Sequence, residues 1–261
     1  STNAPVTINA ATLTPTVSNT GVTKVYDAST SAPTGFTPTY TYSGLVSGDT
    51  SATLSNTGTA YNDANVSQAN KVTVSGLNIT GVTGSNGSLP SDYVLNSTSK
   101  DVSAAITPKT VSLTAAKVYD GTTTLTNAQV TIGTGINGES LTTSAATASD
   151  AHAATSNKSI ASITLADGTG GLASNYQLPA LNSANTSVTI NAATLTPTIS
   201  NTGVTKVYDA STSAPSGFTP TYTYSGLVDG DSGATLSNSG AAYNNANVLQ
   251  ANQVTLSGLS I

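Results

Sequence analysis

The feature that most constrains the fold of this chain is an internal repeat. Residues 6–79 recur almost letter for letter at 188–261, and both stretches open with VTINAATLTPT. The few differences mostly keep the size and polarity of the side chain, as a shared core requires. A diverged copy lies between them, where SNYQL at 174–178 matches SDYVL at 91–95. The repeating unit is therefore about 90 residues long, which is the size of a small domain rather than of a solenoid coil.

Alternation of apolar and polar residues predicts β-strands within each unit. KVTVS at 71–75, TVSLTA at 110–115 and SIASITL at 159–165 place their apolar side chains on one face. Glycine-rich segments such as GTGING at 133–138 predict the turns between them, and no stretch keeps a helical period. We expect an all-β fold of tandem, antiparallel β-sandwich-like modules arranged end to end as an elongated rod.

Two other β arrangements differ from this expectation. A grasp-like sheet within each module stays open, because the sequence does not fix strand order. A continuous β-helix is disfavoured, because it requires a short coil period that the chain lacks.

The repeat also predicts the module boundaries. We expect residues 1–12 to be the terminal strand of a preceding repeat, because STNAPVTI at the start aligns with SANTSVTI at 183–190. Module 1 is then 13–107, module 2 is 108–194, and module 3, which is incomplete, is 195–261. Each module should have a thin core, since large apolar side chains are few.

The tetrad KVYD marks each module near its start. We interpret its residues as a structural signature, in which a strand ends in an Asx-type turn and the tyrosine packs with its hydroxyl hydrogen-bonded. The signature residues are Lys24, Tyr26 and Asp27; Lys117, Tyr119 and Asp120; and Lys206, Tyr208 and Asp209. A sharper alternative is a covalent bond between the lysine and a carboxylate. An acid that follows glycine (Asp49, Glu139 or Asp231) would then act as proton shuttle.

Several motifs recur in the same order and carry a family likeness. KVYDGTT is followed by a Gly-acid pair, by VTVSGLNI, by SNYQL and by a closing SVTI. This order resembles the YDG repeats of very large bacterial surface proteins, among them filamentous-haemagglutinin-like adhesins of the two-partner-secretion type. The resemblance implies an extracellular β module used in tandem in an adhesin, secreted through the outer membrane, and it implies no activity for any residue. Two of the three copies depart from the pattern by reading YDA.

Enzymatic chemistry is disfavoured by the residues that the copies do not share. The single histidine, His152, falls where the other copies have Asn65 and Asn247, and the chain has no cysteine. We therefore expect no enzyme, no catalytic residue and no cofactor. Calcium is a weak alternative at VDGDSG, where Asp229 and Asp231 offer carboxylates, but the six to eight oxygen ligands of Ca²⁺ are not supplied by a recognised loop spacing.

Charge limits the partners. Only 7% of the residues are charged, the net charge is −5, and arginine is absent, so binding to nucleic acid is not expected. No apolar run reaches the roughly 20 residues of a membrane span, so membrane insertion is not expected either. We expect a monomer whose contacts join adjacent repeats, with host or biofilm glycans or proteins as further partners. Six Asn-X-Ser/Thr sequons leave surface glycosylation open.

The expected function is a structural spacer that projects an adhesive region from a bacterial surface, for attachment or biofilm formation. The alternative is that each repeat itself binds a glycan or host protein. Thr and Tyr alternate in TPTYTYSG at 37–44 and 219–226, which would suit either a sugar-binding face or a packed strand.

Overall fold

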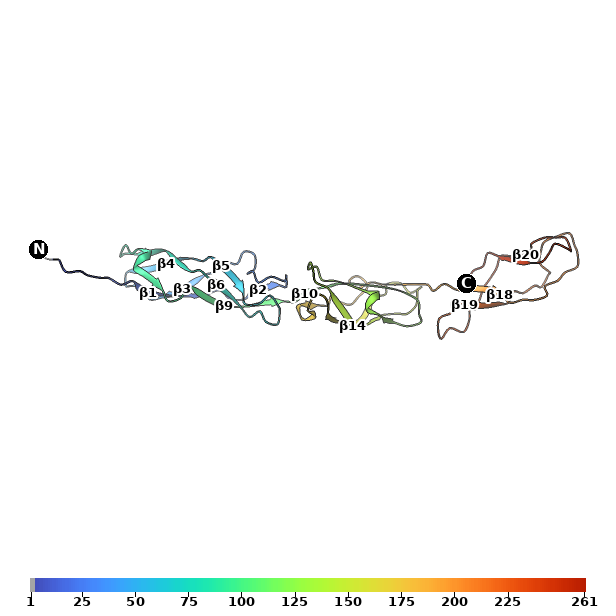
Figure 1. The fold of residues 1–261 in the computed structure, drawn as a ribbon, viewed down its shortest axis with the longest axis horizontal. Coiled ribbons are helices and arrows are strands. Elements are labelled where there is room, and N and C mark those ends of the chain that lie inside the picture. Colours follow the sequence, from blue (N-terminus) through green and yellow to red (C-terminus); the bar gives the residue numbers. More distant parts are fainter. Residues whose placement is uncertain (1–2) are drawn as a thin grey trace.

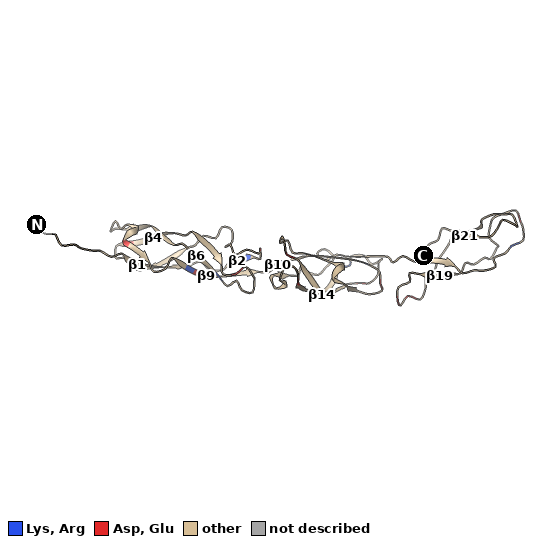
Figure 2. Ribbon diagram, in the orientation of Figure 1, with Lys and Arg blue, Asp and Glu red and all other residues tan. Residues whose placement is uncertain are grey.

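A computed structural model describes residues 3–261, and it is all-β, as the sequence predicts (Figure 1). Three single-turn 3₁₀ helices interrupt the strands: η1 (Pro90–Asp92), η2 (Asn127–Gln129) and η3 (Ala173–Asn175). Among the residues that the structure describes, no helix is long and apolar enough to cross a membrane. Charged residues are sparse along the ribbon (Figure 2).

Module 1 contains nine strands in three sheets. The sheets have the strand orders β2-β9-β6-β5, β3-β1-β8 and β4-β7. The bounds are β1 (Ala11–Val17), β2 (Val22–Val25), β3 (Tyr40–Ser43), β4 (Asp49–Ser55), β5 (Gly58–Tyr61), β6 (Lys71–Ser75), β7 (Asn78–Gly84), β8 (Tyr93–Leu95) and β9 (Ser99–Thr107). Leu13, Ala52, Ile79 and Tyr93 bury the face between the β1 sheet and the β4-β7 sheet.

Module 2 follows the same plan with shorter connections. Its sheets have the orders β10-β16, β13-β11-β17 and β12-β14-β15. The bounds are β10 (Lys109–Thr110), β11 (Ser112–Val118), β12 (Thr124–Leu125), β13 (Val130–Gly133), β14 (Leu141–Ala148), β15 (Ile160–Asp167), β16 (Tyr176–Gln177) and β17 (Val188–Asn191). In module 2 the single strand β11 corresponds to both β1 and β2 of module 1. It pairs antiparallel with β13, as β1 pairs with β3, and parallel with β17, as β2 pairs with β9.

Parallel pairs occur in both of the first two modules, beside antiparallel ones, which corrects the expectation of antiparallel modules. Strand β1 pairs parallel with β8, β2 with β9, β10 with β16, and β11 with β17. A parallel pair needs a long connection rather than a hairpin. Each of these pairs therefore joins a strand at the start of a module to one near its end: the first strand pairs with the penultimate strand, and the second strand pairs with the last.

Module 3 repeats part of this plan. Its strands are β18 (Thr196–Ile199), β19 (Tyr222–Ser225), β20 (Gly240–Tyr243) and β21 (Val254–Ser257), in the pairs β18-β19 and β20-β21. The register of β18-β19 is that of β1-β3, with Thr196 opposite Ser225 as Thr14 is opposite Ser43. The sequence repeat is thus also a structural repeat.

One short sequence forms a strand in module 1 and none in module 3. VTKV is β2 at Val22–Val25, where it pairs with β9, whereas the same four letters at 204–207 belong to no strand. Local propensity is identical in the two places, so the difference comes from the pairing partner.

The N-terminal segment precedes the first strand. Residues 3–10 are exposed and belong to no strand, and β1 begins at Ala11. The first two residues of the predicted terminal strand, 1–2, lie outside the described residues.

Candidate functional site at the junction of two modules

The lysine and aspartate of the tetrad hold a local turn. Lys24 Nζ lies 2.6 Å from Asp27 Oδ1 and donates a hydrogen bond to the carbonyl of Ser29 at 2.6 Å. Asp27 Oδ1 also accepts the backbone N–H of Ser29 at 3.0 Å, so the turn is of the Asx type. The lysine is thereby engaged with oxygen atoms of its own turn.

The other two tetrads repeat this geometry. Lys117 Nζ lies 2.6 Å from Asp120 Oδ1, and Lys206 Nζ lies 2.8 Å from Asp209 Oδ1. The Lys117 side chain is fully buried and donates to the carbonyls of residues 122 and 124 at 3.0 and 2.9 Å. A buried ammonium must have its donors satisfied, and these carbonyls satisfy them.

The residue after the aspartate adopts a left-handed backbone conformation. Ala28 has φ 59°, Ala210 has φ 61° and Gly121 has φ 76°. Glycine reaches this region without strain, whereas a residue with a Cβ pays roughly 1–2 kcal/mol. The positive φ explains why glycine suits the third position of the YDG motif. In the two YDA copies the alanine at that position is strained.

The tyrosine of the first tetrad leaves its own module and contacts module 2. Tyr26 is only 4% exposed, and its ring lies edge-to-face with that of Tyr176, with the centroids 5.4 Å apart and the planes at 75°. Its hydroxyl donates to Glu139 Oε1 at 2.7 Å, and the hydroxyl of Tyr176 donates to Glu139 Oε2 at 2.5 Å. One carboxylate therefore joins a tyrosine of module 1 to a tyrosine of module 2, and we call these three residues the tyrosine–carboxylate clamp.

The electrostatics of the clamp follow from burial beside a carboxylate. Burial, together with the hydrogen bond to Glu139, raises the pKa of Tyr26 to about 12. The same causes raise the pKa of Tyr176. Both tyrosines therefore stay protonated donors over the whole physiological range.

A second contact lies beside the clamp. Asn175, in η3 of module 2, is 1% exposed, and its Oδ1 accepts the backbone N–H of Val66 at 2.9 Å. Its Nδ2 donates to Asn65 Oδ1 at 2.8 Å. Because Tyr26 and residues 65–66 lie on different segments of module 1, the two contacts together resist both separation and rotation of the pair.

Module 1 carries the matching half of a clamp at its other end. The hydroxyl of Tyr93 donates to Asp49 Oδ2 at 2.6 Å and accepts the backbone N–H of Val46 at 2.8 Å. Asp49 follows a glycine as Glu139 does, and Tyr93 stands in SDYVL where Tyr176 stands in SNYQL.

The junction of modules 2 and 3 has some of the same parts. Tyr119 and Asp231 both line a cavity of about 340 Å³, and the ring of Tyr119 stacks on His152, with the centroids 6.2 Å apart. No SNYQL-like segment stands within residues 195–261. Tyr208 of the third tetrad is 59% exposed.

The remaining sequence candidates lie apart from the clamp. Asp229 and Asp231 are exposed on a loop, and within residues 3–261 no three or more histidine, aspartate or glutamate side chains gather as metal ligands would. In β3 (YTYS) the two tyrosines are half-buried and Thr41 is exposed, so the tyrosines lie on the packed face of the strand. The acids after glycine contact tyrosine hydroxyls at residues 49 and 139, rather than the tetrad lysines.

Sequence reasoning missed the clamp. It identified the tyrosine, the Gly-acid pair and the SNYQL segment separately, but did not connect them. Their recurrence in one order in modules 1 and 2 is the signal that would have suggested a shared contact.

The fold and the junction define the chain as an all-β protein of tandem modules, the first two of which are linked through the signature residue Tyr26. The family model described as YDG domain matches residues 9–100, 102–186 and 191–261. The chain therefore belongs to the YDG domain family. Comparison with curated proteins and with solved structures found no match.

Proposed function

We propose that this chain is a spacer in the stalk of a bacterial cell-surface adhesin, where its modules stand end to end as a rod and project an adhesive region for attachment or biofilm formation. The observation that carries the proposal is the tyrosine–carboxylate clamp, in which Tyr26, the tyrosine of the first tetrad, joins module 1 to module 2. Because Tyr26 is buried and its hydroxyl is hydrogen-bonded, it is not available to contact a ligand.

The mechanism of a spacer is mechanical. The clamp and the bonds of Asn175 fix one module on the next, so that reach grows with the number of modules and no new chemistry is needed. The order of the three groups of strands along the long axis supports the rod (Figure 1). Low charge and surfaces rich in Ser and Thr suit a protein that is exposed outside the cell, and we propose secretion through the outer membrane with the family resemblance as the ground.

The alternative function, direct binding by each module, makes a different prediction. The purified chain should be applied to a glycan array and to immobilised extracellular matrix proteins. The spacer proposal expects no saturable binding on either surface. Saturable binding of the purified chain to either surface would show that the modules are themselves adhesive.

A further inference from the structure

The chain enters and leaves each of the two complete modules through strands that pair with each other. In module 1 the first two strands, β1 and β2, pair with the last two, β8 and β9. In module 2 the first two strands, β10 and β11, pair with the last two, β16 and β17. All four pairs are parallel. We call β1, β2, β10 and β11 the entry strands, and β8, β9, β16 and β17 the exit strands.

The direction of these pairs decides how they respond when the chain is pulled at its two ends. Tension reaches an entry strand at its N-terminal end and an exit strand at its C-terminal end. In a parallel pair these two points lie at opposite ends of the ladder, so tension slides one strand along the other and loads all the hydrogen bonds together. In an antiparallel pair the two points would lie at the same end, and tension would open the bonds one after another.

We propose that the parallel pairs of entry and exit strands bear load, so that each complete module resists tension applied along the chain. The second entry strand and the last exit strand carry most of it, because they form four residue pairs in each module. These run from Val22 opposite Ala104 to Val25 opposite Thr107 in module 1. The first entry strand adds three residue pairs in module 1 and two in module 2.

The KVYD tetrad lies at the end of this load-bearing pair. Its lysine and valine form the last two residue pairs of module 1, with Lys24 opposite Ile106 and Val25 opposite Thr107. The backbone N–H of Tyr26 adds a further bond, to the carbonyl of Thr107 at 2.9 Å. Module 2 repeats the two residue pairs and the tyrosine bond, which is 2.8 Å long there. The tetrad therefore closes the ladder that tension would slide.

Apolar side chains of the same strands add to the resistance. In module 1 Val22 and Ile106 are 7% and 3% exposed, and in module 2 Val188 and Ile190 are 6% and 5% exposed. Sliding the strands apart transfers these side chains to water, which is unfavourable. The pair therefore breaks only when its hydrogen bonds and its part of the core are lost together.

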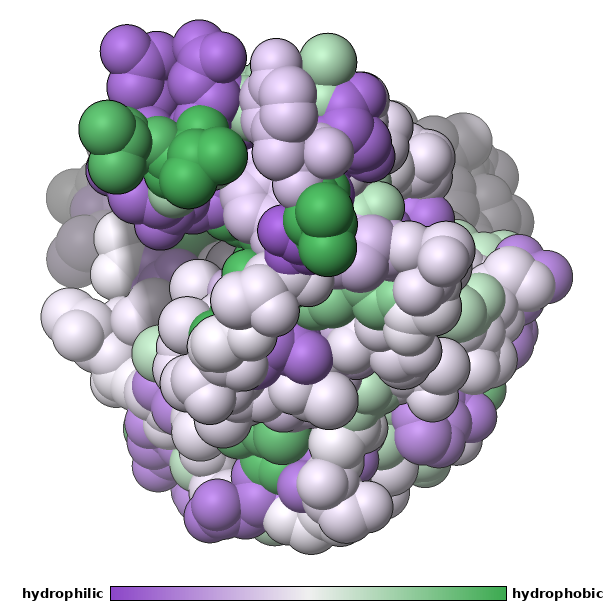
Figure 3. Space-filling view, turned by 90° about the vertical axis from the view of Figure 1, so that its right-hand side faces the viewer, coloured by the Kyte–Doolittle hydropathy of each residue, from purple (hydrophilic) through white to green (hydrophobic). Residues whose placement is uncertain are grey.

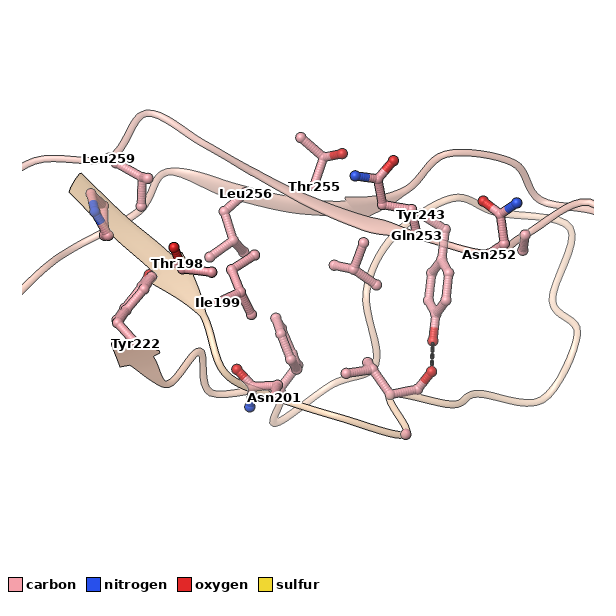
Figure 4. A pocket seen from close by; sticks show the side chains of 16 residues that line it. Thr198, Ile199, Asn201, Tyr222, Tyr243, Asn252, Gln253, Thr255, Leu256 and Leu259 are labelled. Carbon is pink, nitrogen blue, oxygen red and sulfur yellow. Dashed lines mark hydrogen bonds between the residues drawn. The ribbon is translucent and has the colours of Figure 1, made fainter. Parts of the chain in front are cut away.

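Module 3 contains the entry sequence without an exit strand beside it. Among the strands within residues 195–261 none pairs with 204–207, and this segment is not a strand although it has the letters of β2. Val204 lines a cavity of about 740 Å³, and the hydroxyl of Tyr243 donates to its carbonyl (Figure 4). At this end of the molecule hydrophobic residues are exposed among hydrophilic ones (Figure 3). The exit strand thus holds the entry segment extended, so the two should separate as one unit.

The load-bearing role does not rest on the proposed adhesin function. It follows from strand direction and connectivity inside single modules, so it applies to any setting in which the chain is anchored at both ends. The two proposals also fail separately. Binding of the modules to a glycan would contradict the spacer and leave the parallel pairs unchanged, whereas a mechanically weak pair would contradict only the load-bearing role.

The test is single-molecule force spectroscopy on the 261-residue chain in two pulling geometries. The chain has no cysteine, so two introduced cysteines fix where the handles attach. Ser112→Cys with Asn191→Cys pulls β11 at its start and β17 at its end, and slides the pair. Ser112→Cys with Ser187→Cys pulls both strands at their starts, and peels the pair. All three side chains are exposed, so both variants should keep the fold.

The sliding geometry should rupture at a force roughly two- to fourfold higher than the peeling geometry at the same loading rate. The reason is that four residue pairs share the load at once in the first case and take it in turn in the second. Urea denaturation without force should give the two variants the same free energy of unfolding, which shows that the difference lies in the direction of pulling. Equal rupture forces, or a higher force in the peeling geometry, overturn the proposal.

A second measurement uses the chain without substitutions, held by tags at its two termini, so its result does not depend on the folding of a variant. Modules 1 and 2 should rupture as two separate events. Each event should lengthen the tether by roughly 250–300 Å, the extended length of residues 11–107 or 109–191 less their folded length. Gradual lengthening without separate ruptures would show that the parallel pairs do not bear the load, and would overturn the proposal.

Discussion

Replacing Glu139 by alanine is expected to loosen the junction between modules 1 and 2. The substitution removes the carboxylate that accepts hydrogen bonds from Tyr26 and Tyr176. It leaves the edge-to-face contact of the two rings in place. The change should therefore act on the polar part of the clamp and spare the cores of both modules.

The magnitude follows from the two bonds. A hydrogen bond to a charged group contributes roughly 1.5–3 kcal/mol. The side chain of Glu139 is half-buried, and water can replace part of what is lost, so we take about 2–3 kcal/mol for the pair. This corresponds to an opening equilibrium of the junction that rises about 30- to 150-fold. Glu139→Gln keeps one acceptor and should raise it by roughly tenfold.

One backbone amide reports the opening directly. The N–H of Val66 in module 1 donates to Asn175 Oδ1 in module 2 at 2.9 Å, so it is protected by a partner that the junction supplies. Its hydrogen exchange, followed by NMR, should accelerate by the factor given above. The N–H of Tyr61, bonded to the carbonyl of Thr30 within module 1, should exchange at its original rate.

Asp49→Ala is the matched control, because it removes the corresponding acid at the far end of module 1. It should leave the exchange of Val66 unchanged. If Glu139→Ala also leaves that rate unchanged while the protein stays folded, the clamp does not hold the junction and the reasoning is wrong.

Three further changes test other parts of the account. Ala28→Gly should stabilise the protein by roughly 0.5–1 kcal/mol in thermal denaturation, because glycine adopts φ 59° without strain. Gly121→Ala should destabilise it by at least as much. Melting temperatures equal to that of the unchanged protein would show that the alanines are not strained. Lys117→Met should cost roughly 2 kcal/mol, because it removes a fully buried ammonium that has four oxygen partners. Lys71→Met should cost under about 1 kcal/mol, because that side chain is 45% exposed. Similar losses for the two variants in urea denaturation would contradict this. The pKa of Tyr26 is raised to about 12, so its contribution to stability should be complete below pH 10 and be lost as pH rises through about 12. An ultraviolet titration of the protein and of Tyr26→Phe gives the ionisation of Tyr26 by difference. Ionisation of Tyr26 near pH 10 would contradict the prediction.

Much of the fold could be predicted from the sequence because it depends on local pattern. Period-two alternation located β6, β11 and β15, and the aspartate of each tetrad indicated an Asx turn. The offset between the copies predicted a structural repeat, which the shared register of β1-β3 and β18-β19 shows. These features are set by residues close together in the chain.

The rest could not be predicted because it depends on distant partners. The parallel pairing of β2 with β9 joins residues about 80 positions apart, and alternation alone does not reveal a strand's neighbour or direction. VTKV at 204–207 shows the same limit, since its propensity is that of β2 and only its missing partner distinguishes it. The clamp joins residues 113 positions apart, so each of its parts could be interpreted only as a local signature.

Small-angle X-ray scattering on the dilute 261-residue chain tests the central claim, that clamped modules stand end to end. One compact globule of this length should give a radius of gyration of about 18 Å, and three modules in a row should give a clearly larger value. We predict the larger value, with a scattering profile that fits a stiff rod. A radius near the smaller value, or a profile of freely jointed modules, would contradict the account.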